Sequence, residues 1–247
     1  MPPNLVAATV RQGLFTRIVG RRLLYYPELS STMDEAAKLG EGDAEEGAVV
    51  VAEVQNAGRG RQGRSWVSQQ GNLLVSVLFR PDMEALPFIS IIGGIAAARA
   101  VRKVTGLDPK IKWPNDLLCD GAKLGGVLCE AEGDRAVAGI GVNLEGGPPM
   151  EGATTLEAAG GNLPPSADWQ AWLEPLATAI IARLQRLVQL PAPEFLARYR
   201  LHEQLLGQPV AWEGGRGTAL AIGADGALEV RTATGTERLH AGEVSLA

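Results

Sequence analysis

The pattern of apolar and polar residues changes near residue 207 and divides the chain into two parts. Before this point, runs rich in valine and leucine at 47–54 and 72–79 predict buried strands. Beyond it, apolar and polar residues alternate between hairpin turn signals, which predicts short antiparallel strands. The pattern therefore predicts a larger domain over residues 1–206 and a small β-barrel module over residues 207–247.

Helical signals alternate with the predicted strands of the larger domain. The string STMDEAAKL has the form of a capping box, with Thr32 as the N-cap and Glu35 at the third helical position. Apolar stripes predict further helices at 88–104 and 168–190, and another helix that begins at Pro193.

Residues 110–144 have the pattern of a meander of three short strands. The first of these is KIKW, and the string PNDLLCDGAK is expected to form the turn into the second. Together the elements predict an α+β fold, in which a mixed central sheet with flanking helices precedes the small β module.

Composition limits the classes of protein that the chain can belong to. Its 247 residues carry a formal net charge of −5, which argues against general nucleic-acid binding. The start lacks the pattern of an export signal, and no apolar run is long enough to span a bilayer. The cysteines, Cys119 and Cys129, form no CxxC motif. These features predict a cytoplasmic protein with reduced thiols and no membrane partner.

The string GRGRQGRSW at 58–66 is the strongest candidate for binding chemistry. It holds three arginines and no acid, so it is a positive segment in an acidic chain. Guanidinium groups bind phosphate or carboxylate oxygens well, and glycine lets the backbone approach a ligand closely. Trp66 adds a flat face for a ring. Predicted strands flank the segment, which excludes a Rossmann loop, and it lacks the GK[ST] ending of a Walker loop.

Other residues favour an electrostatic site over a protein nucleophile. The only histidines, His202 and His240, are far from the glycine-rich segments, which argues against a zinc site or a Ser-His-Asp triad. Lys112 and Lys123 are further cations, and Asp116 is the first acid between them, followed by Asp120. Gly125 and Gly126 interrupt a strand and predict a bulge or a close approach of ligand. Phosphoryl or nucleotidyl chemistry fits these residues.

Four strings, in this order and spacing, resemble the biotin protein ligase family: GRGRQGRSW at 58–66, KWPND at 112–116, KLGGVLCE at 123–130 and GIGVNL at 139–144. The resemblance implies a class II synthetase-like domain followed by an SH3-like barrel. It also implies a reaction in which biotin and ATP with Mg²⁺ form biotinoyl-5′-AMP. A lysine of the biotin carboxyl carrier protein of acetyl-CoA carboxylase, or of a related carboxylase, then takes the biotin.

The family's residue roles carry over to matching positions. The implied biotin-binding residues are Ser31, Thr32, Gln55, Gly58, Arg59, Gly60, Arg61, Lys123, Gly125 and Gly126. The implied ATP-binding residues are Arg59, Arg61, Arg64, Trp66, Asn115, Lys123 and Asn143. The implied catalytic residues are Arg61, Lys123, Asp116 and Lys112, with Asp116 orienting Mg²⁺ or the incoming lysine. Two alternatives stay open: that Ser31 or Thr32 serves only as a helix cap, and that Asn143 satisfies only buried backbone.

The chain departs from the family in two places. Met33 stands where the family commonly has asparagine, which removes that amide's hydrogen bonds, and Gly125 replaces a frequent alanine. About thirty residues precede Ser31, so we expect no DNA-binding domain and no repressor activity. The alternative functions are a lipoate or octanoate ligase and a biotin-responsive regulatory protein. A homodimer that pairs through the sheet is expected.

Overall fold

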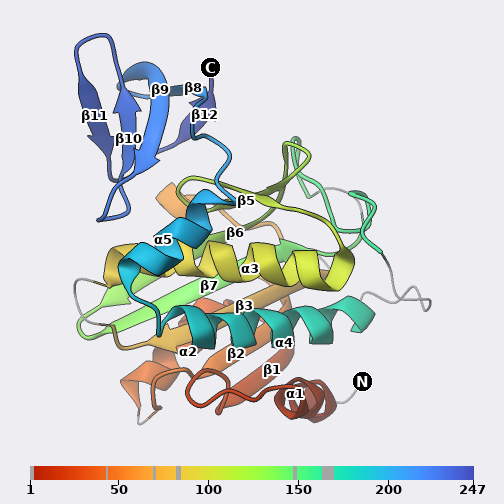
Figure 1. Ribbon diagram of the computed structural model, residues 1–247. Coiled ribbons are helices and arrows are strands. Elements are labelled where there is room, and N and C mark those ends of the chain that lie inside the picture. Colours follow the sequence, from red (N-terminus) through yellow and green to blue (C-terminus); the bar gives the residue numbers. More distant parts are fainter. Residues whose placement is uncertain (1–2, 43, 69–70, 82–84, 147–148, 163–169) are drawn as a thin grey trace.

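A seven-stranded mixed sheet with the order β1-β2-β3-β7-β6-β5-β4 forms the centre of the larger domain in the computed structural model (Figure 1). The structure describes residues 3–42, 44–68, 71–81, 85–146, 149–162 and 170–247. The strands are β1 (Leu23–Leu29), β2 (Val49–Gln55), β3 (Asn72–Phe79), β4 (Lys110–Lys112), β5 (Asp116–Cys119), β6 (Ala122–Glu132) and β7 (Arg135–Asn143). β1 and β2 are parallel, whereas the other neighbouring strands are antiparallel.

Helices cover both faces of this sheet. They are α1 (Pro3–Gln12), α2 (Thr32–Glu41), α3 (Ile89–Thr105), α4 (Gln170–Leu187) and α5 (Ala192–Arg200), with single 3-10 turns η1 (Arg61–Gly63) and η2 (Leu86–Phe88). α3 and α4 lie side by side across one face (Figure 1). α2 packs on the opposite face against β2, β3 and β7. The predicted α+β class with a mixed central sheet and flanking helices is confirmed.

Side chains alternate between two cores because successive residues of a strand point to opposite faces. In β2, Val49 and Val51 belong to the large core under α3 and α4, whereas Val50 belongs to the small core under α2. The small core fills only part of the α2 face. The rest of that face is the floor of the pocket described below.

The N-cap of α2 is Ser31, so the prediction of Thr32 as the cap is wrong. The Asp34 amide donates to Ser31 Oγ at 3.4 Å. The Thr32 hydroxyl is engaged elsewhere, because it donates to Gln55 Oε1 at 2.7 Å. Gln55 in the pocket therefore accepts the Thr32 hydroxyl that the sequence pattern predicted to cap the helix.

The meander over 110–144 has four strands, so the prediction of three is wrong. The string expected to be only a turn contains β5, whose first residue, Asp116, pairs with Lys112 of β4. Asp120 and Gly121 then form a tight turn into β6, both with positive φ. This added strand carries Asp116 to the edge of the pocket.

The C-terminal module is an antiparallel sheet with the order β11-β10-β9-β8-β12. Its strands are β8 (Pro209–Trp212), β9 (Gly215–Ile222), β10 (Leu228–Arg231), β11 (Thr236–Leu239) and β12 (Val244–Leu246). The predicted antiparallel module is confirmed, although no pairing of β11 with β12 closes a barrel among the described residues.

The module contacts the larger domain through specific hydrogen bonds. Trp113 Nε1 donates to the carbonyl oxygen of Gly226 at 3.0 Å, and Arg200 donates to that of Ile222 at 2.9 Å. Trp113 belongs to the KWPND string, so the module is attached next to the expected nucleotide site. Of the helices in the described ranges, none combines the length and apolarity needed to cross a membrane.

Candidate functional site

A pocket lies on the α2 face of the sheet, above β3, β7 and β6. Residues directly opposite one another on neighbouring strands point to the same face. Two such rows underlie the pocket: Leu74, Gly141 and Gly126, and beside them Ser76, Gly139 and Leu128. All of these except the buried Ser76 line it. The glycines make the floor low, which leaves room for a ligand between the sheet, α2 and the arginine loop.

Trp66 lies directly on one of these glycines. A Cβ atom on Gly141 would come within 2.6 Å of Trp66 Cζ2, so only glycine permits the indole ring to sit this close to the sheet. Trp66 Nε1 is buried and has no hydrogen-bond partner among the described residues. A buried donor without a partner is costly, so this atom is available to an acceptor on a ligand.

The pocket brings together most of the residues that the sequence singled out. The lining includes Ser31, Thr32, Gln55, Arg59, Gly60, Arg61, Arg64, Trp66, Asn115, Asp116, Lys123, Gly126 and Asn143. Gly58, Gly125 and Lys112 do not belong to the lining of the described pocket. Gly58 closes the base of the loop, because its carbonyl accepts the Trp66 amide at 2.9 Å.

Gly125 and Gly126, the glycine pair on β6, have different surroundings. The β5–β6 register shifts between Leu117 and Leu118, which confirms the predicted bulge. A Cβ on Gly125 would lie 2.3 Å from the carbonyl oxygen of Gly141. Gly125 therefore admits the neighbouring strand, and only Gly126 faces the pocket.

Hydroxyl and amide groups form a relay at one end of the pocket, which we call the inner end. Gln55 Oε1 accepts both the amide and the hydroxyl of Thr32 at 2.7 Å each. Ser76 Oγ donates to Thr32 Oγ1 at 2.8 Å. Because Gln55 Oε1 is occupied by two donors, its Nε2 remains to face a ligand acceptor.

Ser76 is a site residue that the sequence reasoning missed. It is fully buried inside β3, where all the other residues after Asn72 are apolar. A polar residue inside the run NLLVSVLF was the available signal, since a buried hydroxyl needs a partner.

The arginine loop folds as a small hairpin around η1. The Gly60 amide donates to the carbonyl of Arg64 at 2.7 Å. Arg59 reaches outward to two carboxylates, with N–O distances of 2.7 Å to Asp34 and 2.9 Å to Glu130. The hydrogen bonds with Glu130 and Asp34 raise the pKa of Arg59 further above its ordinary value. Arg59 thus fastens the loop to α2 and β6.

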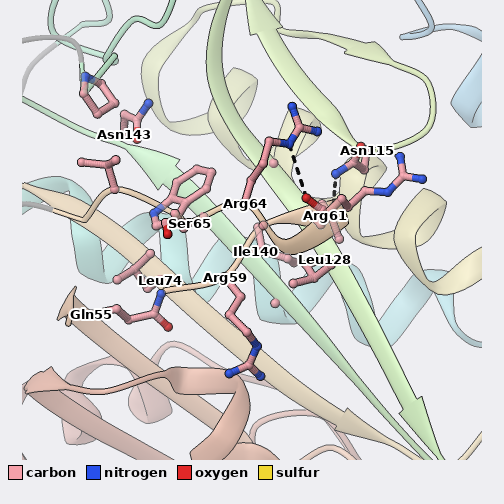
Figure 2. A pocket seen from close by; sticks show the side chains of 18 of the residues that line it. Gln55, Arg59, Arg61, Arg64, Ser65, Leu74, Asn115, Leu128, Ile140 and Asn143 are labelled. Atoms are coloured by element: carbon pink, nitrogen blue, oxygen red, sulfur yellow. Dashed lines mark hydrogen bonds between the residues drawn. The ribbon is translucent and has the colours of Figure 1, made fainter. Parts of the chain in front are cut away.

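Arg61 and Arg64 hold the other side of the loop. Arg61 donates to Asn115 Oδ1 at 3.2 Å and to the carbonyl of Gly242 at 3.4 Å. Burial lowers the pKa of the Arg61 guanidinium. Arg64 pairs with Glu243 of the C-terminal module. In Figure 2, Arg61, Arg64 and Asn115 cluster together, whereas Gln55 lies apart from them.

Three charges meet at the outer end of the pocket. Lys123 Nζ donates to Asp116 Oδ1 at 2.6 Å, and Lys112 Nζ lies 3.8 Å from Asp116 Oδ2. Asp116 is the only acid among the described lining residues, whereas Arg61, Arg64 and Lys123 are cations. This end therefore suits an anion such as a phosphate or a carboxylate.

Asn143 is the last residue of β7 and lies at the pocket. Its Nδ2 donates to the carbonyl of Thr154 at 3.0 Å, which is the buried backbone contact that the alternative role predicts, and the residue also lines the pocket.

Within the described part of the chain, no group of three or more His, Cys, Asp or Glu residues could hold a metal ion. A divalent cation here would need most of its oxygen ligands from a bound phosphate compound.

Comparisons with known proteins agree with this geometry. A sequence model of the Biotin/lipoate A/B protein ligase family matches residues 25–146, and one of the Biotin protein ligase C terminal domain matches residues 205–247. The chain is 34% identical over 231 residues to a biotin--[acetyl-CoA-carboxylase] ligase of Paracoccus denitrificans, covering 87% of this chain and 96% of that protein.

Two other relatives differ in how much of their length is matched. The bifunctional ligase/repressor BirA of Bacillus subtilis is 40% identical over 151 residues, which cover 58% of this chain and 46% of that protein. The match thus spans about half the length of this curated relative. The structure of a biotin protein ligase from Aquifex aeolicus in complex with biotin and ATP superposes with a TM-score of 0.75. It is 29% identical and covers 92% of this chain and 99% of that one.

Proposed function

The chain belongs to the biotin protein ligase family, and we propose that it attaches biotin to a lysine of a biotin carboxyl carrier protein in two steps. In the first, a biotin carboxylate oxygen attacks the α-phosphorus of ATP, and pyrophosphate leaves. In the second, the Nζ of the acceptor lysine attacks the acyl carbon of biotinoyl-5′-AMP. AMP leaves with the electron pair of the broken C–O bond, and the lysine loses a proton.

One observation carries this proposal: a single pocket joins a hydrogen-bonding inner end to a cationic outer end. The relay of Thr32, Gln55 and Ser76 suits a urea-like head group. Lys123 and Arg61 suit a carboxylate and phosphates. Biotin joined to an adenylate has these two chemistries at its two ends.

The residues of the pocket supply charge and position, not a nucleophile. Lys123 stabilises the negative charge that develops between the carboxylate and the α-phosphate. Arg61 and Trp66 enclose the adenylate, with Trp66 Nε1 as a free donor. Holding the two reactants in line lowers the barrier without a covalent enzyme intermediate.

Magnesium fits this site as a companion of ATP. Asp116, whose Oδ1 accepts a hydrogen bond from Lys123 Nζ, is the acid of the described lining that would hold the ion. Mg²⁺ usually keeps several waters and binds through one or two carboxylates together with substrate phosphates. The ion would neutralise phosphate charge during the displacement.

The proposal is tested by incubating the protein with ATP, Mg²⁺, an apo carrier domain and either radiolabelled biotin or radiolabelled lipoate. Labelled carrier in the biotin reaction and none in the lipoate reaction is the expected result. Label from lipoate alone would favour the lipoate ligase alternative, which the matched family also includes. No label from biotin would contradict the proposal.

The partners beyond biotin and ATP belong to the same proposal. β1 is an edge strand of the sheet, which supports a homodimer that pairs through the sheet. The net charge of −5 supports an enzyme that binds no specific DNA. Sedimentation with and without biotinoyl-AMP tests the first statement. A gel-shift titration with a pool of duplex DNA fragments, in the presence of biotin and ATP, tests the second, since a tight specific complex would favour the regulatory alternative.

A further inference from the structure

Met33 is an apolar residue beside the hydroxyl relay. It lies in the first turn of α2, is 5% exposed and lines the pocket. A Cβ atom on Gly139 would come within 2.8 Å of Met33 Sδ, so the thioether rests directly on the sheet at this glycine. The same Cβ position is 3.5 Å from Ser76 Oγ. The thioether therefore lies beside the relay.

The inner end of the pocket has two walls of different chemistry. Thr32 and Gln55 form the polar wall, and Ser76 supports it from behind by donating to Thr32. Met33 forms the apolar wall together with Leu128, which lies opposite Gly139 in the sheet. A ligand that fits both walls has a hydrogen-bonding edge on one side and an apolar ring on the other.

We propose that Met33 is a specificity-determining residue, which contacts the sulfur-containing ring of the ligand and selects it over a head group that lacks this ring. The inference rests on the proposed function. Methionine suits the task because its unbranched thioether is polarisable and adapts to the shape of a ring. The side chain at position 33 has no hydrogen-bonding amide or hydroxyl, which makes this wall apolar.

A purely structural role for Met33 predicts something different. Met33 also packs in the small core under α2. Loss of packing alone would weaken the binding of every ligand by a similar factor. A contact with the ring would weaken biotin more than desthiobiotin, which has the urea group and the carboxylate but no sulfur ring.

The experiment combines one change in the protein with one change in the ligand and compares all four pairs. Isothermal titration calorimetry gives Kd for biotin and desthiobiotin with the wild-type chain and with Met33→Ala. The ratio Kd(desthiobiotin)/Kd(biotin) should fall at least about fivefold in Met33→Ala, because a pocket contact with an apolar group is worth this much or more. An unchanged ratio would overturn the inference.

Two further variants control for the environment and for folding. Leu201, at the C-terminal end of α5, is 77% exposed and does not belong to the lining of the described pocket. Leu201→Ala also truncates an apolar side chain and should leave the ratio unchanged; an equal fall would overturn the inference. Met33→Leu keeps the apolar volume and should retain most of the wild-type ratio. A ratio as low as that of Met33→Ala would also count against it.

The binding readout separates this inference from its premise. A wild-type chain that binds biotin but fails to label the carrier would contradict the proposed function, while the ratio would still test Met33. A wild-type chain that binds neither ligand would overturn both. Thermal unfolding of each variant verifies that a changed Kd belongs to a folded protein.

Discussion

Lys123 Nζ lies 2.6 Å from Asp116 Oδ1 inside the pocket. The carboxylate of Asp116 thus takes the place that a bound anion would have beside the ammonium group. Lys112, 3.8 Å from the other carboxylate oxygen, adds a second cation. An entering carboxylate and phosphate compete with Asp116 for the ammonium group of Lys123. We expect Lys123 to exchange its partner as the acyl-adenylate forms, since the developing charge is greatest there.

Replacement of this lysine should therefore affect the first step most. Lys123→Met should lower kcat/KM for biotin-dependent pyrophosphate release by about 100-fold or more, as for the loss of a group that stabilises transition-state charge. Lys110→Met is the matched control, because Lys110 pairs with Asp108 at the surface, 2.9 Å away. The control should stay within about twofold of wild type. Equal losses in both variants would contradict the role of Lys123.

Arg61 is expected to keep the adenylate enclosed until the acceptor lysine arrives. It joins the loop to Asn115 and to Gly242, so its removal opens that side of the pocket. Arg61→Gly should release biotinoyl-AMP and label lysines of an unrelated protein present in the reaction. Arg216→Gly, the same change at an exposed position of β9, should label only the carrier domain. Mass spectrometry of both proteins gives the comparison, and strict carrier selectivity in Arg61→Gly would count against this assignment.

The contact between Arg64 and Glu243 gives the C-terminal module a part in closing the loop. Both side chains are more than half exposed, so the pair contributes modestly. Glu243→Gln should raise the KM for ATP about two- to fivefold and should speed tryptic cleavage within 58–66. Glu237→Gln, an exposed change on β11, is the control and should alter neither. Identical digestion of all three proteins would show that the module does not restrain the loop.

Much of this site was readable from the sequence because its residues fall in four dense strings. The arginine loop and Lys123 were found from charge and glycine content, and the structure brings both to one pocket. The exact α2 cap could not be found this way. Ser31 and Thr32 both fit the cap pattern, and the choice depends on Gln55, which is 23 positions away from Thr32.

The residues that were missed or misplaced depend on strand pairing. Ser76 enters the site because β3 aligns it with Gly139. Gly125 leaves the lining because a neighbouring carbonyl occupies the space beside it. β5 was hidden in a string with a turn composition, since its partner β4 has only three residues. Register between distant strands is not encoded locally, so a single sequence does not reveal it.

Ser76 should matter for binding although it is buried beneath Thr32. Ser76→Ala removes the donor to Thr32 Oγ1, which leaves the relay with one hydrogen bond fewer. Biotin binding should weaken about five- to tenfold, the usual effect of one lost hydrogen bond. Ser245→Ala, an exposed change on β12, should leave Kd unchanged in the same calorimetric titration. A Ser76→Ala protein that binds biotin as tightly as wild type would exclude the relay from ligand binding.

Cys129 is expected to be an unreactive thiol at neutral pH. Burial, and to a lesser extent the charge of Glu130, raises its pKa from 9.0 to about 11. At pH 8 the folded chain then has about 100-fold less thiolate at this position than an ordinary thiol, and only the thiolate reacts. Alkylation of Cys129 by iodoacetamide should be slower than in urea by about that factor. The rate should rise about tenfold per pH unit up to about 11.

The raised pKa of Cys129 also makes the free energy of unfolding depend on pH. Because the folded-state pKa is above the unfolded one, the contribution of Cys129 is fully present below pH 9 and is lost as pH rises towards 11. Cys129→Ala should flatten this part of the pH profile of the free energy of unfolding. Cys119→Ser serves as the background, so that one thiol reports in each experiment. Equal alkylation rates for folded and unfolded chains at pH 8 would mean that the thiol is exposed and ionises normally.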